Sequence, residues 1–266
     1  MRTLGIIAGL GTLAGAHFYR RLIEMSPADA DSEHIPVILM SDPAVPSRIH
    51  HLSGHGSSPV PKLVDMAQKL VQAGAHLIAI PSTTTSIYQA EIASHIGVPI
   101  VSLIEEVAAE IAKSGCRKIG IMGTTPTRTY RVYEDAFGGA GLEAVYPDEE
   151  TQKEIMGVIV SVKEASGLGL QSEGRGVRAL IEDAGSKAVQ LAQRPWSQEL
   201  DGILLACTEL PVIFPSDPSV LSGLKVPLFR STDILAAAVV REMYTHDYTG
   251  LRMNLVSEDE RLRLER

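Results

Sequence analysis

Cysteine is scarce in this sequence, and so are aromatic residues and long apolar runs. Only two cysteines, Cys116 and Cys207, occur among 266 residues, too few for a disulfide framework or a cysteine-rich metal site. None of the eight histidines stands in a spacing typical of metal ligands. We therefore expect no metal. The glycine-rich "GLGTLAG" has the wrong spacing for a nucleotide-binding fingerprint, so no nucleotide cofactor is indicated either. The longest apolar run is far too short to span a bilayer, so no membrane association is expected.

Positive charge is also in short supply. The net charge is −8 and no basic patch occurs, which argues against a nucleic-acid partner. Hydrophobic residues make up 45% of the chain and charged residues 21%, a composition typical of globular proteins. The first residues lack the pattern of a signal peptide. A cytoplasmic protein is the expectation.

Short apolar runs alternate with helical patterns along the chain. Continuous apolar runs of this kind are typical of parallel strands that are covered on both faces by helices. The sequence therefore predicts an α/β fold with parallel sheets. The runs that predict strands are 3–11, 35–43, 76–82, 98–104, 118–127, 142–148, 201–210 and 226–232.

The two halves of the chain correspond piece by piece. "LGIIAGLGT" matches "IGIMGTTPT", "LIAIPSTTT" matches "ILLACTELP", and "GVPIVSLIEE" matches "KVPLFRSTDI". Three matches in the same order favour an internal duplication at the scale of a domain. Chance similarity is the alternative, because every strand-and-helix unit shares an apolar strand and a polar turn.

Small hydroxyl residues gather where the predicted strands end. Ligands bind beyond the carboxyl ends of parallel strands, and loops of Gly, Ser and Thr before helices offer donors to a small carboxylate. Cys207 follows one such strand, in the place that Ser82 holds in the first copy. We interpret Cys207 as a reactive thiol whose pKa is lowered by the start of a helix, and Cys116 as structural.

The motifs together resemble the aspartate/glutamate racemase family, whose members racemise amino acids without a cofactor. The resemblance covers about Arg2 to Tyr244 and is carried by "GIIAGLG", "HIPVILMSDPAVPSR", "AGAHLIAIP", "GIMGTTPT", "QKEIMGVIVSVK" and "LLACTELP". It implies two pseudo-symmetric α/β domains with the active site in the cleft between them. It also implies a homodimer, and one cysteine per domain to remove and return the α-proton on opposite faces.

The resemblance assigns roles to residues of this chain. Arg48 matches the arginine that grips a substrate carboxylate, and Lys163 matches a lysine associated with the side-chain carboxylate of an acidic substrate. Cys207 matches the cysteine of the second domain, with Ser82 as its opposite number. Further donors are expected from Thr83, Thr84, Thr124, Thr127 and Thr208, and the glycine-rich loop contains Gly9 and Gly11.

For the domains we expect residues 1–100 plus about 210–250 in the first, residues 101–209 in the second, and a charged tail over 251–266. The expected partner is a small amino acid or dicarboxylate.

Several positions depart from the family pattern. The family loop usually has cysteine, asparagine and histidine where this chain has Ser82, Thr83 and Ser86, and Arg230 and Leu235 replace an aspartate and a histidine. A serine hydroxyl is a far weaker base than a thiolate. Without a neighbouring base it does not take an α-proton at neutral pH.

Three explanations of Ser82 remain open. It is an engineered replacement for cysteine, or a natural divergence towards single-thiol chemistry, such as a decarboxylase or a one-directional isomerase. In the third explanation, the protein binds a carboxylate without catalysis. The changes at the other positions argue against engineering as the whole account.

Overall fold

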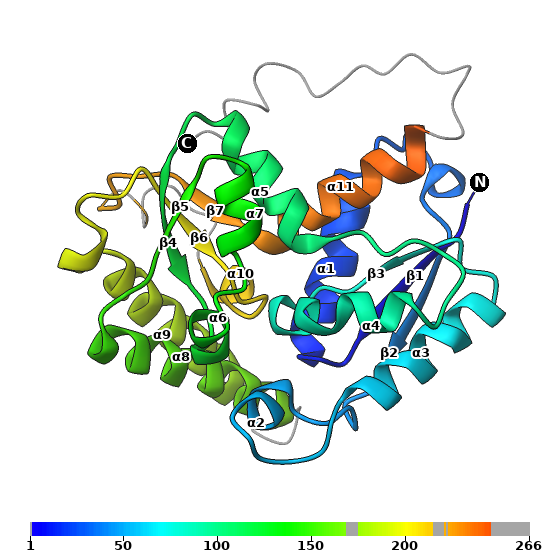
Figure 1. Cartoon of the computed structure of the whole chain (residues 1–266), viewed down its shortest axis with the longest axis horizontal. Helices are drawn as coiled ribbons and strands as arrows, with labels where there is room; N and C mark the ends of the chain where they lie inside the picture. Colours follow the sequence, from blue (N-terminus) through cyan, green and yellow to red (C-terminus); the bar gives the residue numbers. More distant parts are fainter. Residues whose placement is uncertain (1, 169–174, 215–220, 222, 246–266) are drawn as a thin grey trace.

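The computed structural model describes residues 2–168, 175–214, 221 and 223–245; the predicted charged tail lies outside them. Within these residues the strands form two parallel sheets (Figure 1), one with the order β2-β1-β3 and the other β5-β4-β6-β7. Helices flank both sheets. The α/β fold with two short parallel sheets, predicted from the sequence, is confirmed.

The first sheet has β1 (Leu4–Ala8) at its centre, between β2 (Val37–Ser41) and β3 (Leu77–Ala79). Leu4 pairs with Val37 on one side and with Leu77 on the other. A parallel bridge beyond β3 joins Ile78 to Ile100. The helices of this part are α1 (Thr12–Met25), α2 (Arg48–Leu52), α3 (Val60–Gln72), α4 (Gln89–Ala93) and α5 (Leu103–Lys113), with 3-10 turns over Asp31–Glu33 and Thr83–Tyr88.

The second sheet repeats this arrangement around β4 (Lys118–Met122). β4 lies between β5 (Glu143–Val145) and β6 (Gly202–Leu205), and β7 (Leu228–Arg230) pairs beyond β6. The helices are α6 (Thr125–Thr129), α7 (Glu134–Gly139), α8 (Glu149–Leu168), α9 (Arg175–Ala192), α10 (Leu210–Ile213) and α11 (Ser231–Thr245), with a 3-10 turn over Pro195–Ser197.

The strand orders support the duplication read from the sequence. β1 and β4 are the matching central strands, β3 and β6 lie on matching sides, and β7 holds the place of the bridge at Ile100. One part of the predicted domain limits is wrong, because β7 falls in the stretch 210–250 yet pairs with the second sheet. α11, which follows it, packs against α1 and α5. The other limits stay a prediction.

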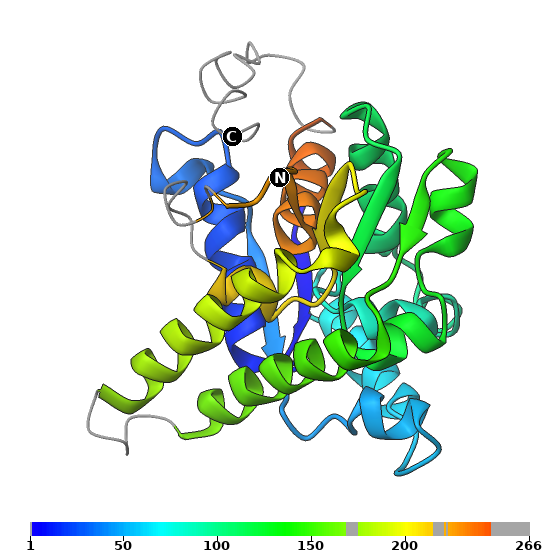
Figure 2. The ribbon, with the colours of Figure 1, turned by 90° about the vertical axis from the view of Figure 1, so that its left-hand side faces the viewer.

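The core has three apolar clusters. The central cluster joins residues of both sheets, such as Leu4 and Leu204, to Phe18 of α1 and Leu235 of α11. A second cluster lies between the first sheet and α3. A third lies under α8 and α9, which Figure 2 shows running together beside the second sheet. The two halves therefore share their central core. No helix among the described residues is long and apolar enough to cross a membrane.

A single glycine allows the first strand to turn towards the site. Gly9 follows β1 with φ +81°, and a Cβ there would lie 2.5 Å from the backbone nitrogen of Asp42. Side chains rarely adopt this backbone conformation, and this one would also collide with the end of β2. Glycine at position 9 thus lets the loops after β1 and β2 run side by side.

Candidate functional site

Loops from both sheets line one cavity of about 270 Å³. They follow the carboxyl ends of β1, β2, β3, β4 and β6, the edge where parallel sheets bind ligands. Every site residue named from the sequence lies in the wall: Gly9, Gly11, Arg48, Ser82, Thr83, Thr84, Thr124, Thr127, Lys163, Cys207 and Thr208. The matching positions 82 and 207 thus face one space. The chemical roles of these residues remain predictions.

Ser82 is held by its neighbours in the hydroxyl loop. Its side chain is buried, and its Oγ accepts a hydrogen bond of 2.7 Å from Oγ1 of Thr85. Within the described chain, no histidine, lysine or carboxylate bonds to this hydroxyl. Since a serine needs such a base to act at neutral pH, Ser82 is not equipped to remove a proton.

Three more threonines of the wall have hydroxyl partners. Oγ1 of Thr83 lies 3.4 Å from the Oη atom of Tyr133, a fully buried tyrosine whose pKa is raised by burial. Thr124 caps α6: its Oγ1 accepts from the backbone nitrogen of Thr127 at 3.3 Å and lies 2.9 Å from that residue's Oγ1. Thr83, Thr124 and Thr127 are therefore held by side-chain hydrogen bonds, which suits them to position a bound group.

Arg48 brings a buried positive charge to the cavity. It begins α2, donates through Nη2 to the carbonyl oxygen of Leu10, and lies 3.4 Å through Nη1 from that of Pro46. Its Nε is buried without an acceptor among the described residues. Burial lowers the pKa of the Arg48 guanidinium, and the negative charge of Glu209 opposes this. A buried guanidinium with unused hydrogen-bonding capacity suits an anionic ligand.

A thiol, a carboxylate and an ammonium group meet on the other side. Sγ of Cys207 donates to Oε2 of Glu209 over 2.9 Å. Oε1 of the same carboxylate forms an ion pair with Nζ of Lys163. The Glu209 side chain is 4% exposed and that of Lys163 29%. The carboxylate is thus a buried bridge between the thiol and the lysine.

The predicted lowering of the Cys207 pKa is wrong. Burial of the thiol raises its pKa well above the usual value, the charge of Glu209 raises it further, and Lys163 lowers it only in part. The helix after the thiol, α10, has only four residues, so its dipole is weak. At neutral pH Cys207 is therefore a thiol and not a thiolate.

The loop after β1 fixes the spacing of the two positive groups. The carbonyl oxygen of Leu10 accepts from Arg48, and also from Nζ of Lys163 at 3.2 Å. At Gly11 a Cβ would collide with Oε1 of Glu209 and lie 3.2 Å from Nζ of Lys163. A glycine at position 11 leaves room for the carboxylate bridge.

Sequence reasoning gave Glu209 no role, although it stands in the same motif as Cys207. The available signal was a carboxylate two residues after the thiol, next to a buried strand. Of the positions that depart from the family, Ser82 and Thr83 line the cavity, whereas Arg230 and Leu235 are absent from its wall and Leu235 lies in the central core. No group of histidine, cysteine, aspartate or glutamate side chains among the described residues is arranged to hold a metal ion.

The sequence of this chain is similar to a known protein family and to a characterised relative. A family model described as Asp/Glu/Hydantoin racemase matches residues 7–239. The broad specificity amino-acid racemase RacX of Bacillus subtilis (strain 168) is 25% identical over 244 residues, which cover 89% of this chain and 96% of that protein.

Two solved structures share the whole architecture. The aspartate racemase of Picrophilus torridus superposes with a TM-score of 0.74 and 25% identity, over 99% of this chain and 100% of that one. An aspartate racemase homologue from Pyrococcus horikoshii OT3 gives a TM-score of 0.66 and 26% identity, over 91% and 99%.

Proposed function

Because the chain belongs to the Asp/Glu/Hydantoin racemase family, we propose that it is an isomerase that moves the α-proton of a small amino acid without a cofactor. One observation carries the proposal: the equivalent positions 82 and 207 line the same cavity as Arg48 and Lys163. A carbon atom bound there can be approached from two sides by groups of the two halves.

The charges around the cavity favour an acidic amino acid such as aspartate or glutamate, or a related dicarboxylate. Arg48 and Lys163 supply two positive groups, and Glu209 supplies one negative group. A zwitterion with two carboxylates and one ammonium group complements that set. Thr83, Thr84, Thr124, Thr127 and Thr208 would donate hydrogen bonds to carboxylate oxygens.

The chemistry requires that charge on the α-carbon be stabilised while a proton is moved. An α-proton is weakly acidic, so the carboxylate must be held by donors that accept the developing charge. We assign this work to Arg48 and the threonine hydroxyls. Cys207 is the acid and base on one face, and position 82 serves the opposite face.

Ser82 limits the chain as it stands to one face. Its hydroxyl has no base beside it in the described structure and is occupied by Thr85. We therefore expect solvent exchange of the α-proton with retention of configuration to be faster than inversion. Ser82→Cys should supply the missing group and raise the rate of inversion.

Incubation in deuterated water tests this proposal. L- and D-forms of aspartate and glutamate are incubated with the chain, with Ser82→Cys and with Ser94→Cys, which adds a thiol at an exposed position. Proton NMR measures loss of the α-proton, and chiral chromatography measures inversion. Inversion that rises with Ser82→Cys but not with Ser94→Cys supports the assignment. If Ser82→Cys changes neither quantity for any of these substrates, the substrate assignment is wrong.

A single-thiol enzyme is the second candidate, and the state of Cys207 favours it. Because burial and Glu209 raise the pKa of the thiol, Cys207 is prepared to donate a proton, as a decarboxylase or one-directional isomerase needs on one face. Carbon dioxide released from a dicarboxylate substrate would distinguish the decarboxylase. A non-catalytic carboxylate-binding protein would instead show ligand-induced thermal stabilisation that Cys207→Ala leaves intact, with no exchange.

A homodimer is also proposed, on the family resemblance. Sedimentation of the whole chain at micromolar concentration checks it, and a species with the mass of one chain would contradict it.

A further inference from the structure

Glu209 carries a buried charge, and the proton transfer proposed above gives it no part in the movement of the proton. Its side chain is 4% exposed, and both carboxylate oxygens are engaged, one by the thiol of Cys207 and the other by Lys163. Burying a carboxylate is costly unless it is paired. Because a buried carboxylate beside the reactive sulfur is energetically costly, we infer that it has a functional role there.

The protonated state of the Cys207 thiol means that the site needs a group to accept the thiol proton. Burial and the neighbouring carboxylate both raise the pKa of Cys207, so the thiol keeps its proton at neutral pH. A protonated thiol can accept an α-proton only if its own proton leaves at the same time. The site therefore needs a proton acceptor in contact with Sγ.

Glu209 lies where it can accept the proton of the Cys207 thiol. Its Oε2 lies 2.9 Å from Sγ and already accepts the thiol proton as a hydrogen bond. Lys163 contacts the other oxygen, so the carboxylate is paired on the side away from the thiol while Oε2 stays directed at Sγ. Gly11 leaves the space in which this arrangement fits.

We propose that Glu209 is the positioning residue of Cys207 and the holder of its proton, so that thiol and carboxylate act as one acid–base pair anchored by Lys163. This inference rests on the proposed function. The sulfur lone pair forms a bond to the α-proton while the old S–H bond breaks and its proton passes to Oε2. The electrons of the C–H bond stay on the α-carbon and spread into its carboxylate. In the return step the carbon takes the proton from sulfur, and sulfur recovers its proton from Glu209.

The pair has a signature that a structural role would not produce. Glu209→Gln removes a negative charge that raises the pKa of Cys207, so the thiol should ionise more easily and yet transfer protons less well. The charged groups around the thiol are Glu209, Lys163 and Arg48, and the buried phenol of Tyr133 is a further titratable group. Only Glu209 changes in this variant.

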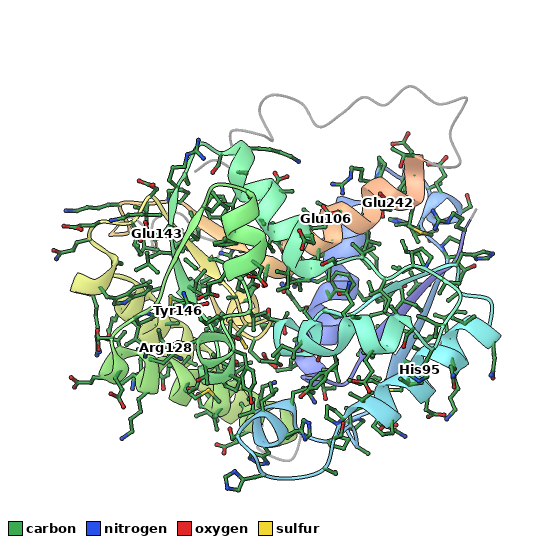
Figure 3. All side chains as sticks on the ribbon, in the orientation of Figure 1. His95, Glu106, Arg128, Glu143, Tyr146 and Glu242 are labelled. Carbon is green, nitrogen blue, oxygen red and sulfur yellow. The ribbon has the colours of Figure 1, made fainter. Side chains whose placement is uncertain are left out.

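Two measurements test the pair on the whole chain. Alkylation of Cys207 by iodoacetamide as a function of pH gives the ionisation midpoint and needs no substrate; Cys116→Ser in every variant leaves one thiol to follow. Deuterium exchange at the α-carbon of aspartate or glutamate gives proton transfer. Glu209→Asp keeps the charge but shortens the reach, and Glu143→Gln on β5 is the matched control, an exposed glutamate at the outer side of the second sheet (Figure 3).

We expect Glu209→Gln to lower the alkylation midpoint by at least about one pH unit and to slow exchange at least about tenfold, as for a lost general base. Glu209→Asp should keep the high midpoint with intermediate exchange, and Glu143→Gln should match the unaltered chain. Exchange that is unchanged or faster in a folded Glu209→Gln would overturn the pair, because the thiolate alone would then be the base. If the unaltered chain exchanges no α-proton, it is the proposed function that fails. If the alkylation midpoint of Glu209→Gln equals that of the unaltered chain, Glu209 does not influence the thiol and the pair is refuted.

Discussion

Replacing Gly11 by alanine adds one methyl group where the carboxylate bridge is tightest. The backbone at Gly11 is extended, with φ −159° and ψ 123°, so alanine fits without backbone strain. The new Cβ would instead collide with Oε1 of Glu209 and press on Nζ of Lys163. Because the Glu209 carboxylate is buried between the thiol of Cys207 and Lys163, it cannot swing into solvent. The methyl group must therefore displace it from the thiol, from the lysine, or from both.

The expected magnitude follows from those contacts. Alanine is a poorer N-cap than glycine for α1, which costs about 0.5 kcal/mol. Loss of a hydrogen bond to the buried carboxylate costs about 1.5–3 kcal/mol, reduced because Lys163 is partly exposed. We expect a destabilisation of about 2–3 kcal/mol and, for a chain of this size, a fall in melting temperature of about 4–10 °C. Exchange should fall at least about tenfold, since about 1.4 kcal/mol at the transition state suffices.

Thermal melting followed by circular dichroism and α-proton exchange in deuterated water check this prediction. Gly97→Ala is the matched control, because a Cβ at Gly97 meets nothing within 4 Å. Gly11→Ala with the melting temperature and exchange rate of the unaltered chain would refute the reasoning. Glu209 would then have room to move without losing its partners, and Gly11 would not fix the bridge.

Two further predictions concern stability. Burial and Glu209 raise the pKa of Cys207, so the folded chain keeps a proton that the unfolded chain loses above pH about 8.5. The free energy of unfolding should therefore fall as the pH rises above that value, by up to about 1.4 kcal/mol per pH unit. Urea unfolding at several pH values should show a shallower fall for Cys207→Ala, and equal slopes would contradict the raised pKa. Gly120→Ala would place a Cβ 2.8 Å from Cζ3 of Trp196 and should destabilise the chain by about 1–3 kcal/mol through overpacking. The fluorescence of this single tryptophan should shift as well. Gly157→Ala within α8, whose Cβ meets nothing within 4 Å, should leave the fluorescence unchanged and should stabilise the chain by about 0.5–1 kcal/mol through helix propensity.

The sequence was sufficient to predict the features that depend on local pattern. Apolar runs closed by small residues placed β3 and β6, and their likeness predicted that Ser82 and Cys207 hold equivalent positions. Because parallel strands end at one edge, that likeness also predicted a common cavity wall. The wall of the observed cavity contains both residues.

Features that depend on contacts distant in sequence were out of reach. Glu209 has its role only because Lys163, on a helix 46 residues earlier, comes to its second oxygen. The direction of the Cys207 pKa depends on burial and on that carboxylate; the motif contains both residues but does not show that their side chains meet in a buried place. The predicted domain limits put β7 with the first half, although the match of "KVPLFRSTDI" with "GVPIVSLIEE" indicated the second sheet, where the structure has it.

The double use of the Leu10 carbonyl has a consequence for how such sites diversify. A backbone oxygen persists through nearly every point mutation, whatever side chain residue 10 carries. The distance between Arg48 and Lys163 therefore depends on the backbone after β1, where both donate to the carbonyl oxygen of Leu10. A substitution of the Leu10 side chain should change this distance little. Relatives with other substrate preferences would then be expected to vary the hydroxyl-bearing loops facing this oxygen, while the span between the two cations stays constant.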